Sequence, residues 1–479
     1  MTPSRVLLVS ADLQSLLKCI RIKQCFVDGG GVALDSGVTA LIIIAVMLIL
    51  YVTELLPIAV TSLLACLALA VFGVIPLESA FSGFGNDIVF MLAGMTVVGA
   101  ALFETGAAGV IGRRIISVVC TNEKAFIAAL MVFSIPFSAF LSNTATAAIM
   151  LPIASSAITA SGGKLLKKHT YMAIGITCVA GGGLTLVSST PQLIAQGLLK
   201  EGGYQTIGFF TIGAFGLPIL ALLMVFFLTF GFALQKKVFD FPEVGDGADG
   251  DSSGSVGGSS PGSVGVITDL NHDSDAADAQ QDPVRMYIAL GALVFCIIGY
   301  ITGLWTMGIV SMTGAVVCVA AGCIPQKTVF LKIDWTTVIL MGCSFGVAAG
   351  LDVSGGGKLI AQSIISLLGD NVSPWLLFSS LALTAVILTN LMSSTATGAL
   401  LIPIAIYASA ELGYDVKSAA IAVAIAANVG YATPISTPPL TMTLSGGYRF
   451  KDYLIVGGVF NILAYALLVV LFPLVLSIR

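Results

Sequence analysis

The chain has 479 residues, of which 57% are hydrophobic and only 10% are charged. A soluble globular domain carries roughly 25% charged residues, so this composition excludes a soluble protein and predicts several membrane-spanning segments. The formal net charge of −4 is misleading, because residues 240–285 hold ten acidic residues against a single arginine.

The first part of the chain predicts a tail followed by three membrane spans. Residues 1–35 contain no apolar run long enough to cross a bilayer, so we expect a solvated tail. Three apolar runs follow, at residues 36–52, 55–73 and 88–103, each near the length that a hydrocarbon core of roughly 30 Å requires. Residues 112–119 are short and amphipathic, which predicts a helix lying along the membrane surface.

A Ser-rich polar turn interrupts the next apolar stretch and predicts a helical hairpin over residues 126–160. The arm before the turn, residues 126–141, measures about 24 Å at helical rise. The chain then reverses at Ser142 and Asn143 into a second arm. Because both arms are short for a full span, we expect a re-entrant hairpin. Two tilted spanning helices joined by a tight turn are the alternative.

A second polar interruption predicts a broken helix. The apolar segment 171–199 contains the sequence GGGLTLVSSTPQ at residues 181–192. Glycines, hydroxyls and a proline within a span predict an unwound helix, which a membrane tolerates only where it lines a cavity or is buried in protein. Residues 209–234 predict a full span, and the Gly-, Ser- and Asp-rich segment 235–285 is expected to be a flexible, disordered linker.

The second half of the chain repeats this order of elements. Its spans are predicted at residues 286–301, 305–323 and 336–350, its hairpin at 375–410, its broken helix at 418–444 and its last span at 453–476. The chain therefore divides into a tail (1–35), a first repeat (36–234), the linker (235–285) and a second repeat (286–479).

Three motifs recur in both halves in the same order. GVIP matches GCIP, FLSNTATAAIMLP at 140–152 matches LMSSTATGALLIP at 391–403, and TLVSSTPQ at 185–192 matches TPISTPPL at 433–440. Each half has five predicted crossings, so the halves enter the membrane from opposite sides. The predicted fold class is an all-α polytopic membrane protein with two inverted-topology repeats, each with a re-entrant helical hairpin and a broken transmembrane helix.

The two hairpin tips carry the polar groups of an ion-binding site. In each hairpin the second arm begins at a Thr-Ala-Thr sequence, so its positive dipole end and free N–H groups face the Ser-rich tip. N–H groups and hydroxyls suit an anion, whereas carbonyls, hydroxyls and the Asn143 amide oxygen suit a small hard cation such as Na⁺. A site with both sets is typical of a cation-coupled anion carrier. The alternative is that these residues only mediate helix packing.

These motifs resemble those of the divalent-anion/sodium symporter (DASS) family within the ion-transporter superfamily. The SNT tip at residues 142–144, its partner in the second half and the TPISTPP loop carry the resemblance, which covers 36–478 apart from the linker. The family implies sodium-coupled symport of a di- or tricarboxylate, or sulfate, by an elevator-type alternating-access mechanism in a homodimer. It also implies a multi-pass protein of a plasma or inner membrane, in contact with the lipid bilayer and with no nucleic acid.

The same resemblance implies the binding residues. The anion would contact both tips and the second loop, at Ser142, Asn143, Thr144, Ser393, Ser394, Thr395 and Pro438. Sodium ions would bind beside the tips, at Ser138, Ser142, Asn143, Ser188, Thr389, Ser394, Ser436 and Thr437. The chain departs from the family pattern at Ser394, where Asn is expected, and at Leu186, Thr190 and Gln192, where Pro, Pro and Asn are usual.

Other functions fit the sequence less well. A Na⁺/H⁺ or arsenite antiporter of the same superfamily would require an ionisable group within the membrane, and no apolar run contains one. An anion exchanger is a further alternative. An enzyme is disfavoured, because the sequence offers no nucleophile–base pair, metal cluster or phosphate-binding loop.

Overall fold

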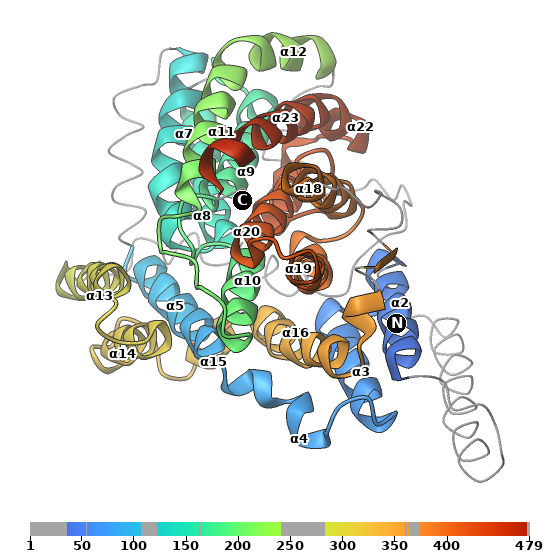
Figure 1. Ribbon diagram of the computed structural model, residues 1–479. Coiled ribbons are helices and arrows are strands. Elements are labelled where there is room, and N and C mark those ends of the chain that lie inside the picture. Colours follow the sequence, from blue (N-terminus) through green and yellow to red (C-terminus); the bar gives the residue numbers. More distant parts are fainter. Residues whose placement is uncertain are drawn as a thin grey trace, which may run out of the picture.

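The computed structural model describes residues 36–53, 55–106, 122–161, 164–240, 283–359, 362–363 and 373–476. Every regular element in these residues is a helix (Figure 1). Seven of the described helices are long and apolar enough to cross a membrane, or eight if one bent pair counts as a single span. The predicted tail, the amphipathic segment 112–119 and most of the linker lie outside the described residues.

The first repeat consists of a helical pair, a third long helix, a hairpin, a broken helix and a closing bent helix. In chain order these elements are α2 (Ser36–Thr53), α3 (Ile58–Val71), α4 (Leu77–Ala80), η1 (Ser82–Gly85), α5 (Asp87–Glu104), the hairpin α7 (Glu123–Phe140) and α8 (Asn143–Ala160), the broken helix α9 (Lys167–Gly181) and α10 (Thr190–Glu201), and the closing α11 (Gly213–Leu228) and α12 (Phe230–Val238).

The second repeat has the same order of elements, as predicted. They are α13 (Pro283–Thr302), α14 (Met307–Ala320), α15 (Val329–Lys332), α16 (Trp335–Val353), the hairpin α18 (Pro374–Leu391) and α19 (Ser394–Glu411), the broken helix α20 (Val416–Ala426) and α21 (Pro438–Met442) with η3 (Thr443–Gly446), and a last span of α22 (Phe450–Asp452), the π-helical η4 (Tyr453–Gly457) and α23 (Gly458–Val475).

The two repeats exchange packing partners symmetrically. α5 packs on α14 of the second repeat, while its counterpart α16 packs on α3 of the first. In the same way α10 packs on α19 and α21 packs on α8, and α11 packs on α23. Figure 1 shows the pairs α2–α3 and α13–α14 on opposite sides, with α5 and α16 between them and the hairpins above. This is the packing of two inverted repeats related by a two-fold axis.

A capping serine starts the second arm of each hairpin. Ser142 Oγ accepts a hydrogen bond from Ala145 N at 3.1 Å, and Ser393 Oγ accepts one from Ala396 N at 3.2 Å. Such caps pair N–H groups that the start of a helix leaves without an internal partner. The first arms, α7 and α18, have 18 residues each and are longer than the sequence predicts.

The second helix of each repeat is shorter than the predicted span. α3 and α14 have 14 residues each, or about 21 Å at helical rise. Each ends at the repeated GVIP or GCIP motif, where Gly73 and Gly322 adopt φ angles of 71° and 70°. In both cases the next N–H group donates back to a helix carbonyl at 2.9 Å. The motif is therefore a glycine helix stop, which a count of apolar residues does not detect.

Residues 209–234, which the sequence predicts as a full span, form two helices, α11 and α12, that meet at a bend of 52°. The break lies at Thr229, whose Oγ1 donates to Val225 O at 2.5 Å. Hydroxyl bonds of this kind to the preceding turn bend helices. A Cβ added at Gly231 would lie 2.7 Å from the Phe226 ring, so only glycine permits this close approach after the bend.

Candidate functional site

Three predicted sodium-site residues of the first repeat meet around Gly182. Ser138 Oγ, buried in α7, contacts Cys178 O and lies 2.8 Å from Asn143 Oδ1. Ser188 Oγ donates to Gly182 O at 2.7 Å. A Cβ added at Gly182 would lie 2.5 Å from Asn143 Oδ1, so the amide packs directly on this glycine. We call this hydroxyl, amide and carbonyl set the Gly182 cluster, and its oxygens suit a hard cation.

The second repeat builds a matching Gly430 cluster. Thr389 Oγ1 donates to Ala427 O at 2.7 Å, and Ser436 Oγ donates to Gly430 O. A Cβ added at Gly430 would lie 2.9 Å from Ser436 Cβ and 3.0 Å from Thr389 Oγ1. Ser394 N donates to Ser436 O at 3.0 Å, which ties the tip of the hairpin to the broken loop. The structure thus brings Thr389, Ser394 and Ser436 together.

The hairpin tips are more accessible than the clusters behind them. Ser142 and Thr144 are exposed, and Ser393 and Thr395 are half-buried, while Ser394 is 8% exposed. Hydroxyls and helix N–H groups can therefore be reached from outside, whereas the oxygen clusters are enclosed. An anion needs the first arrangement, and a small desolvated cation needs the second.

The site has no full charge of its own. Residues 138–146, 182–192, 389–397 and 427–440 contain no Lys, Arg, His, Asp or Glu. Positive potential at the tips comes from the N-termini of α8 and α19, each equivalent to roughly half an elementary charge. The site is therefore neutral apart from helix dipoles.

The two repeats contact each other at the broken loops. Ser189 Oγ donates to Asn428 Oδ1 at 2.5 Å across the repeat boundary. A Cβ added at Gly398 in α19 would lie 2.8 Å from Pro191 Cβ in α10. Among the described residues no hydrogen bond joins the tip 142–144 to the tip 393–395. The two halves thus meet at the loops through residues other than the predicted ones.

Two predicted residues of the second loop differ in their surroundings. Thr437 is buried, and its Oγ1 has no hydrogen-bond partner among the described residues. A buried hydroxyl without a partner costs free energy, so this position favours a ligand. Pro438 is exposed at the first turn of α21, with no polar side-chain group to offer.

The sequence prediction omits three amide side chains close to the clusters. Asn390 Oδ1 accepts from Ala432 N at 3.0 Å, and Gln192 Nε2 donates to Gly182 O at 3.1 Å. Asn428 is the third, through its bond to Ser189. Asn390 and Asn428 each stand among apolar neighbours in the chain, and a buried amide in such a run requires partners. An amide within an apolar run therefore identifies Asn390 and Asn428 as buried polar residues from the sequence, but it does not reveal their hydrogen-bond partners.

Inverted repeats with paired hairpins, and broken helices that meet between them, define the architecture of a secondary transporter. The family of citrate transporters, CitMHS, matches residues 41–419 of this chain. The chain belongs to this family.

Relatives named as transporters match most of the chain. It is 26% identical over 453 residues to a protein of Haemophilus influenzae described as an uncharacterized transporter, with 89% of each chain covered. It is 24% identical over 466 residues to the sodium-dependent dicarboxylate transporter SdcS of Staphylococcus saprophyticus, covering 91% of this chain and 85% of that protein. SdcS of Staphylococcus aureus is 25% identical over 460 residues, with 89% and 84% covered.

Two solved structures share the fold. The YdaH transporter of Alcanivorax borkumensis superimposes with a TM-score of 0.55 at 14% identity, covering 82% of this chain and 86% of its own. MtrF of Neisseria gonorrhoeae, described within a class of antimetabolite efflux pumps, gives a TM-score of 0.55 at 13% identity, with 92% and 96% covered. The protein is a multi-pass membrane transporter and not an enzyme, and its predicted kinship with divalent-anion/sodium symporters is confirmed.

Proposed function

We propose that the protein is a sodium-coupled symporter of a divalent anion, with a di- or tricarboxylate, or sulfate, as its substrate. The observation that carries this proposal is the pairing, in both repeats, of a helix N-terminus at a tip with an enclosed cluster of oxygens. The sodium-dependent dicarboxylate transporters among the relatives support the same assignment.

The anion would bind between the two tips. Ser142, Thr144, Ser393 and Thr395 offer hydroxyl groups there, and the first N–H groups of α8 and α19 offer further donors. Helix ends supply roughly half a charge each, so a dianion would remain under-compensated in a site of low dielectric constant. Additional positive charge has to come from bound ions.

Na⁺ would supply that charge from the two clusters. Ser138, Asn143 and Ser188 would hold one ion at the Gly182 cluster. The second ion would bind at the Gly430 cluster, beside Thr389, Ser394, Ser436 and Thr437. Because each cluster joins a tip to a broken loop, a bound cation would also assemble the anion pocket. Na⁺ would therefore bind before the anion.

Reconstituted protein in liposomes gives the direct test. Succinate, citrate, sulfate and phosphate are offered with and without an inward Na⁺ gradient, and with Li⁺ in its place. We expect uptake of at least one of these anions to fall steeply as Na⁺ is withdrawn, with Li⁺ a poor substitute. Full-rate uptake driven by a pH gradient without Na⁺, or anion exchange indifferent to Na⁺, would contradict the proposal and favour an antiporter or an exchanger.

We further propose an elevator-type motion within a homodimer. The hairpins and broken helices would slide against a scaffold that includes α5. At this boundary Lys200 Nζ lies 3.4 Å from Asp87 Oδ2, and Asn86 Nδ2 donates to Glu201 Oε1 at 3.0 Å. Sliding would separate these groups. A cross-link between Asp87→Cys and Lys200→Cys should stop uptake that each single variant retains, and continued uptake after complete cross-linking would exclude the elevator. Light scattering of purified protein tests the dimer.

A further inference from the structure

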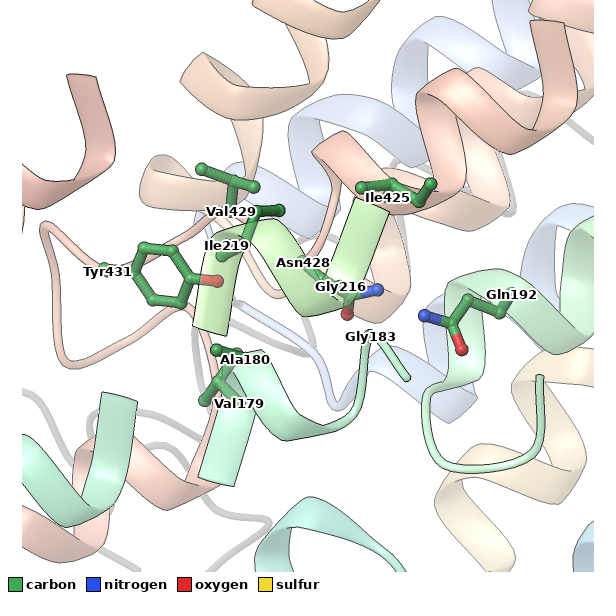
Figure 2. Close-up of a pocket in the computed structure, with 10 residues that line it drawn as sticks. All are labelled: Val179, Ala180, Gly183, Gln192, Gly216, Ile219, Ile425, Asn428, Val429 and Tyr431. Carbon is green, nitrogen blue, oxygen red and sulfur yellow. The ribbon is translucent and has the colours of Figure 1, made fainter. Parts of the chain in front are cut away.

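One cavity of the structure lies far from the candidate site in the fold. A narrow cavity of about 10 Å³ beside Gln192 and Asn428 has room for one water molecule and belongs to the broken loops described above (Figure 2). A larger cavity of about 220 Å³ lies between α13 and α14. Figure 1 shows these two helices side by side at the edge of the molecule, and α13 exposes large apolar side chains such as Val294 and Ile298. The larger cavity therefore lies on the surface that faces the lipid.

The walls of this cavity, which we call the α13–α14 groove, are apolar. Among its lining residues are Ile288, Gly291, Ala292, Phe295, Gly314 and Val317. Ala292 and Gly314 are buried, whereas Gly291 and Val317 are exposed, so the groove opens outward. A Cβ added at Gly291 would meet no side chain and no neighbouring helix within 4 Å. An apolar cavity of about 150 Å³ holds a benzene molecule, so this groove can hold part of a hydrocarbon chain.

The groove occupies mainly one half of the membrane thickness. With 20 residues, α13 is about 30 Å long, close to the thickness of the hydrocarbon core. Its lining residues run from Ile288 to Phe295, roughly 8–18 Å from the start of the helix. Phe295 lies next to Trp305 at the deeper end, with 6.4 Å between the ring centroids. An acyl chain that descends from the membrane surface at the start of α13 would reach this depth.

Arg285 lies at the shallow end of the groove. It precedes Ile288 by three positions and Ala292 by seven, so it continues the face of α13 that lines the groove. A Cβ added at Gly322, in the turn after α14, would lie 3.9 Å from Arg285 Cζ. The guanidinium therefore reaches from α13 to the end of α14. Its five N–H donors allow an arginine to bind a phosphate while it keeps another partner. Lys327, in the loop after α14, adds positive charge at the same end.

We propose that the α13–α14 groove binds an anionic phospholipid, with one acyl chain in the groove and the phosphate on Arg285. A phospholipid carries its anion and its apolar chain in the order in which this surface presents the arginine and the groove. Neither α13 nor α14 contains an acidic residue, so a second copy packed here through these helices would offer Arg285 no anion. Because α14 packs on α5 of the first repeat, the lipid should stabilise the contact between the repeats. The inference is independent of the proposed function.

Thermal unfolding of the purified full chain in lipid-free detergent tests this inference. Palmitoyl-oleoyl-phosphatidylglycerol is titrated into the protein, and diacylglycerol with the same two chains serves as the lipid without a phosphate. We expect phosphatidylglycerol to raise the unfolding temperature in a saturable manner and diacylglycerol to have little effect. Equal shifts with both lipids would show that the phosphate is not recognised and would overturn the inference.

The variant Gly291→Leu fills the groove at a position where an added side chain has space. It should stay folded and lose most of the shift that phosphatidylglycerol produces. Val294→Leu, on the exposed face of the same helix and outside the groove, is the matched control and should respond like the wild type. A full shift in Gly291→Leu contradicts the proposal. If light scattering then shows a changed oligomeric state, a second copy occupies the groove instead.

Arg285→Gln provides a second arm that leaves the groove intact. Half of the maximal shift should then require about ten times more phosphatidylglycerol, because one hydrogen bond between two charged groups is lost. Lys451→Gln removes an exposed positive charge on α22 and is the matched control. If both variants need the same amount of lipid, Arg285 does not hold the phosphate and the inference fails.

Discussion

The two halves of the candidate site use the same backbone hydrogen bonds and differ in their side chains. Thr185 Oγ1 donates to Ala139 O in the first half, and Thr433 Oγ1 donates to Asn390 O at 2.9 Å in the second. Each loop serine likewise donates to the carbonyl of the glycine six positions before it. Because the acceptors of these hydrogen bonds are backbone carbonyls, the conformation of each loop does not depend on which side chains surround the acceptors.

The amide group is placed differently in the two halves. In the first, Asn143 stands at the tip, where its Oδ1 lies 2.8 Å from Ser138 Oγ. In the second, Ser394 occupies the tip, and Asn390, one turn earlier, uses its Oδ1 to accept from Ala432 N. The first half therefore has an amide beside its ligand groups, whereas the second half uses its amide to hold the loop. If the two clusters bind Na⁺ as proposed, the first should bind it more tightly than the second.

The largest effect is expected from Asn143→Ala. If Asn143 binds the cation as proposed, loss of its amide should reduce uptake by about 100-fold, since one hydrogen bond to a charged ligand contributes about 1.5–3 kcal/mol. Ser394→Ala, at the equivalent position, removes no amide and should change uptake far less. Uptake kinetics and thermal unfolding are measured for both variants. If Asn143 only packs helices, the variant will lose stability and keep its Na⁺ dependence, which would remove this residue from the site.

Asn390→Ala should have an intermediate effect. The change leaves the buried Ala432 N–H without its partner, at a cost of about 1–3 kcal/mol. The corresponding N–H of the first loop, on Leu184, donates to Gly181 O at 3.1 Å and needs no side chain. We expect a lower unfolding temperature and about tenfold more Na⁺ for half-maximal uptake, because the second loop must be ordered by the ion alone.

Thr384→Ala supplies the control for Asn390→Ala. Thr384 lies on the same helix, is exposed, and bonds only Ser380 O of the preceding turn, at 2.9 Å. Its loss should alter neither the unfolding temperature nor the Na⁺ requirement. If Asn390→Ala behaves like Thr384→Ala, the second loop does not depend on the amide.

The local features of this site can be predicted from the sequence, because a cluster of polar residues within an apolar segment must find hydrogen-bond partners inside the protein. The hairpin predicted at 126–160 corresponds to α7 (Glu123–Phe140) and α8 (Asn143–Ala160), and α9 ends at Gly181, where the predicted interruption 181–192 begins. Caps and glycine runs act within a few residues, so their positions follow from the chain alone.

Contacts between the repeats could not be predicted in the same way. Ser189 and Asn428 are 239 positions apart, and their hydrogen bond depends on how the two broken helices pack. Hydropathy likewise does not register the bend between α11 and α12. Sequence patterns therefore identify which residues are polar within the membrane, while the fold decides which of them share a partner.

The smallest and most specific effect is expected from Ser394→Asn. This variant gives the second tip the amide that the first tip has in Asn143. Space for that amide exists in the first half because Gly182 has no side chain, and the corresponding residue of the second half is also a glycine, Gly430. An added amide oxygen near Thr389 and Ser436 should strengthen the second cation site and lower the Na⁺ requirement about threefold, well below the effect of losing Asn143.

The double variant Ser394→Asn with Asn390→Ala tests whether the two amide roles are separable, because it moves the amide from the position that holds the loop to the tip. If the two amide roles are separable, the double variant should recover part of the Na⁺ affinity lost in Asn390→Ala without recovering its unfolding temperature. Affinity and stability are read from the same preparation by Na⁺-dependent uptake and thermal unfolding. A Ser394→Asn protein that needs more Na⁺ than the wild type would mean that the tip serine is itself the better ligand. The two halves would then be specialised for different ions, and the second would not be a weaker copy of the first.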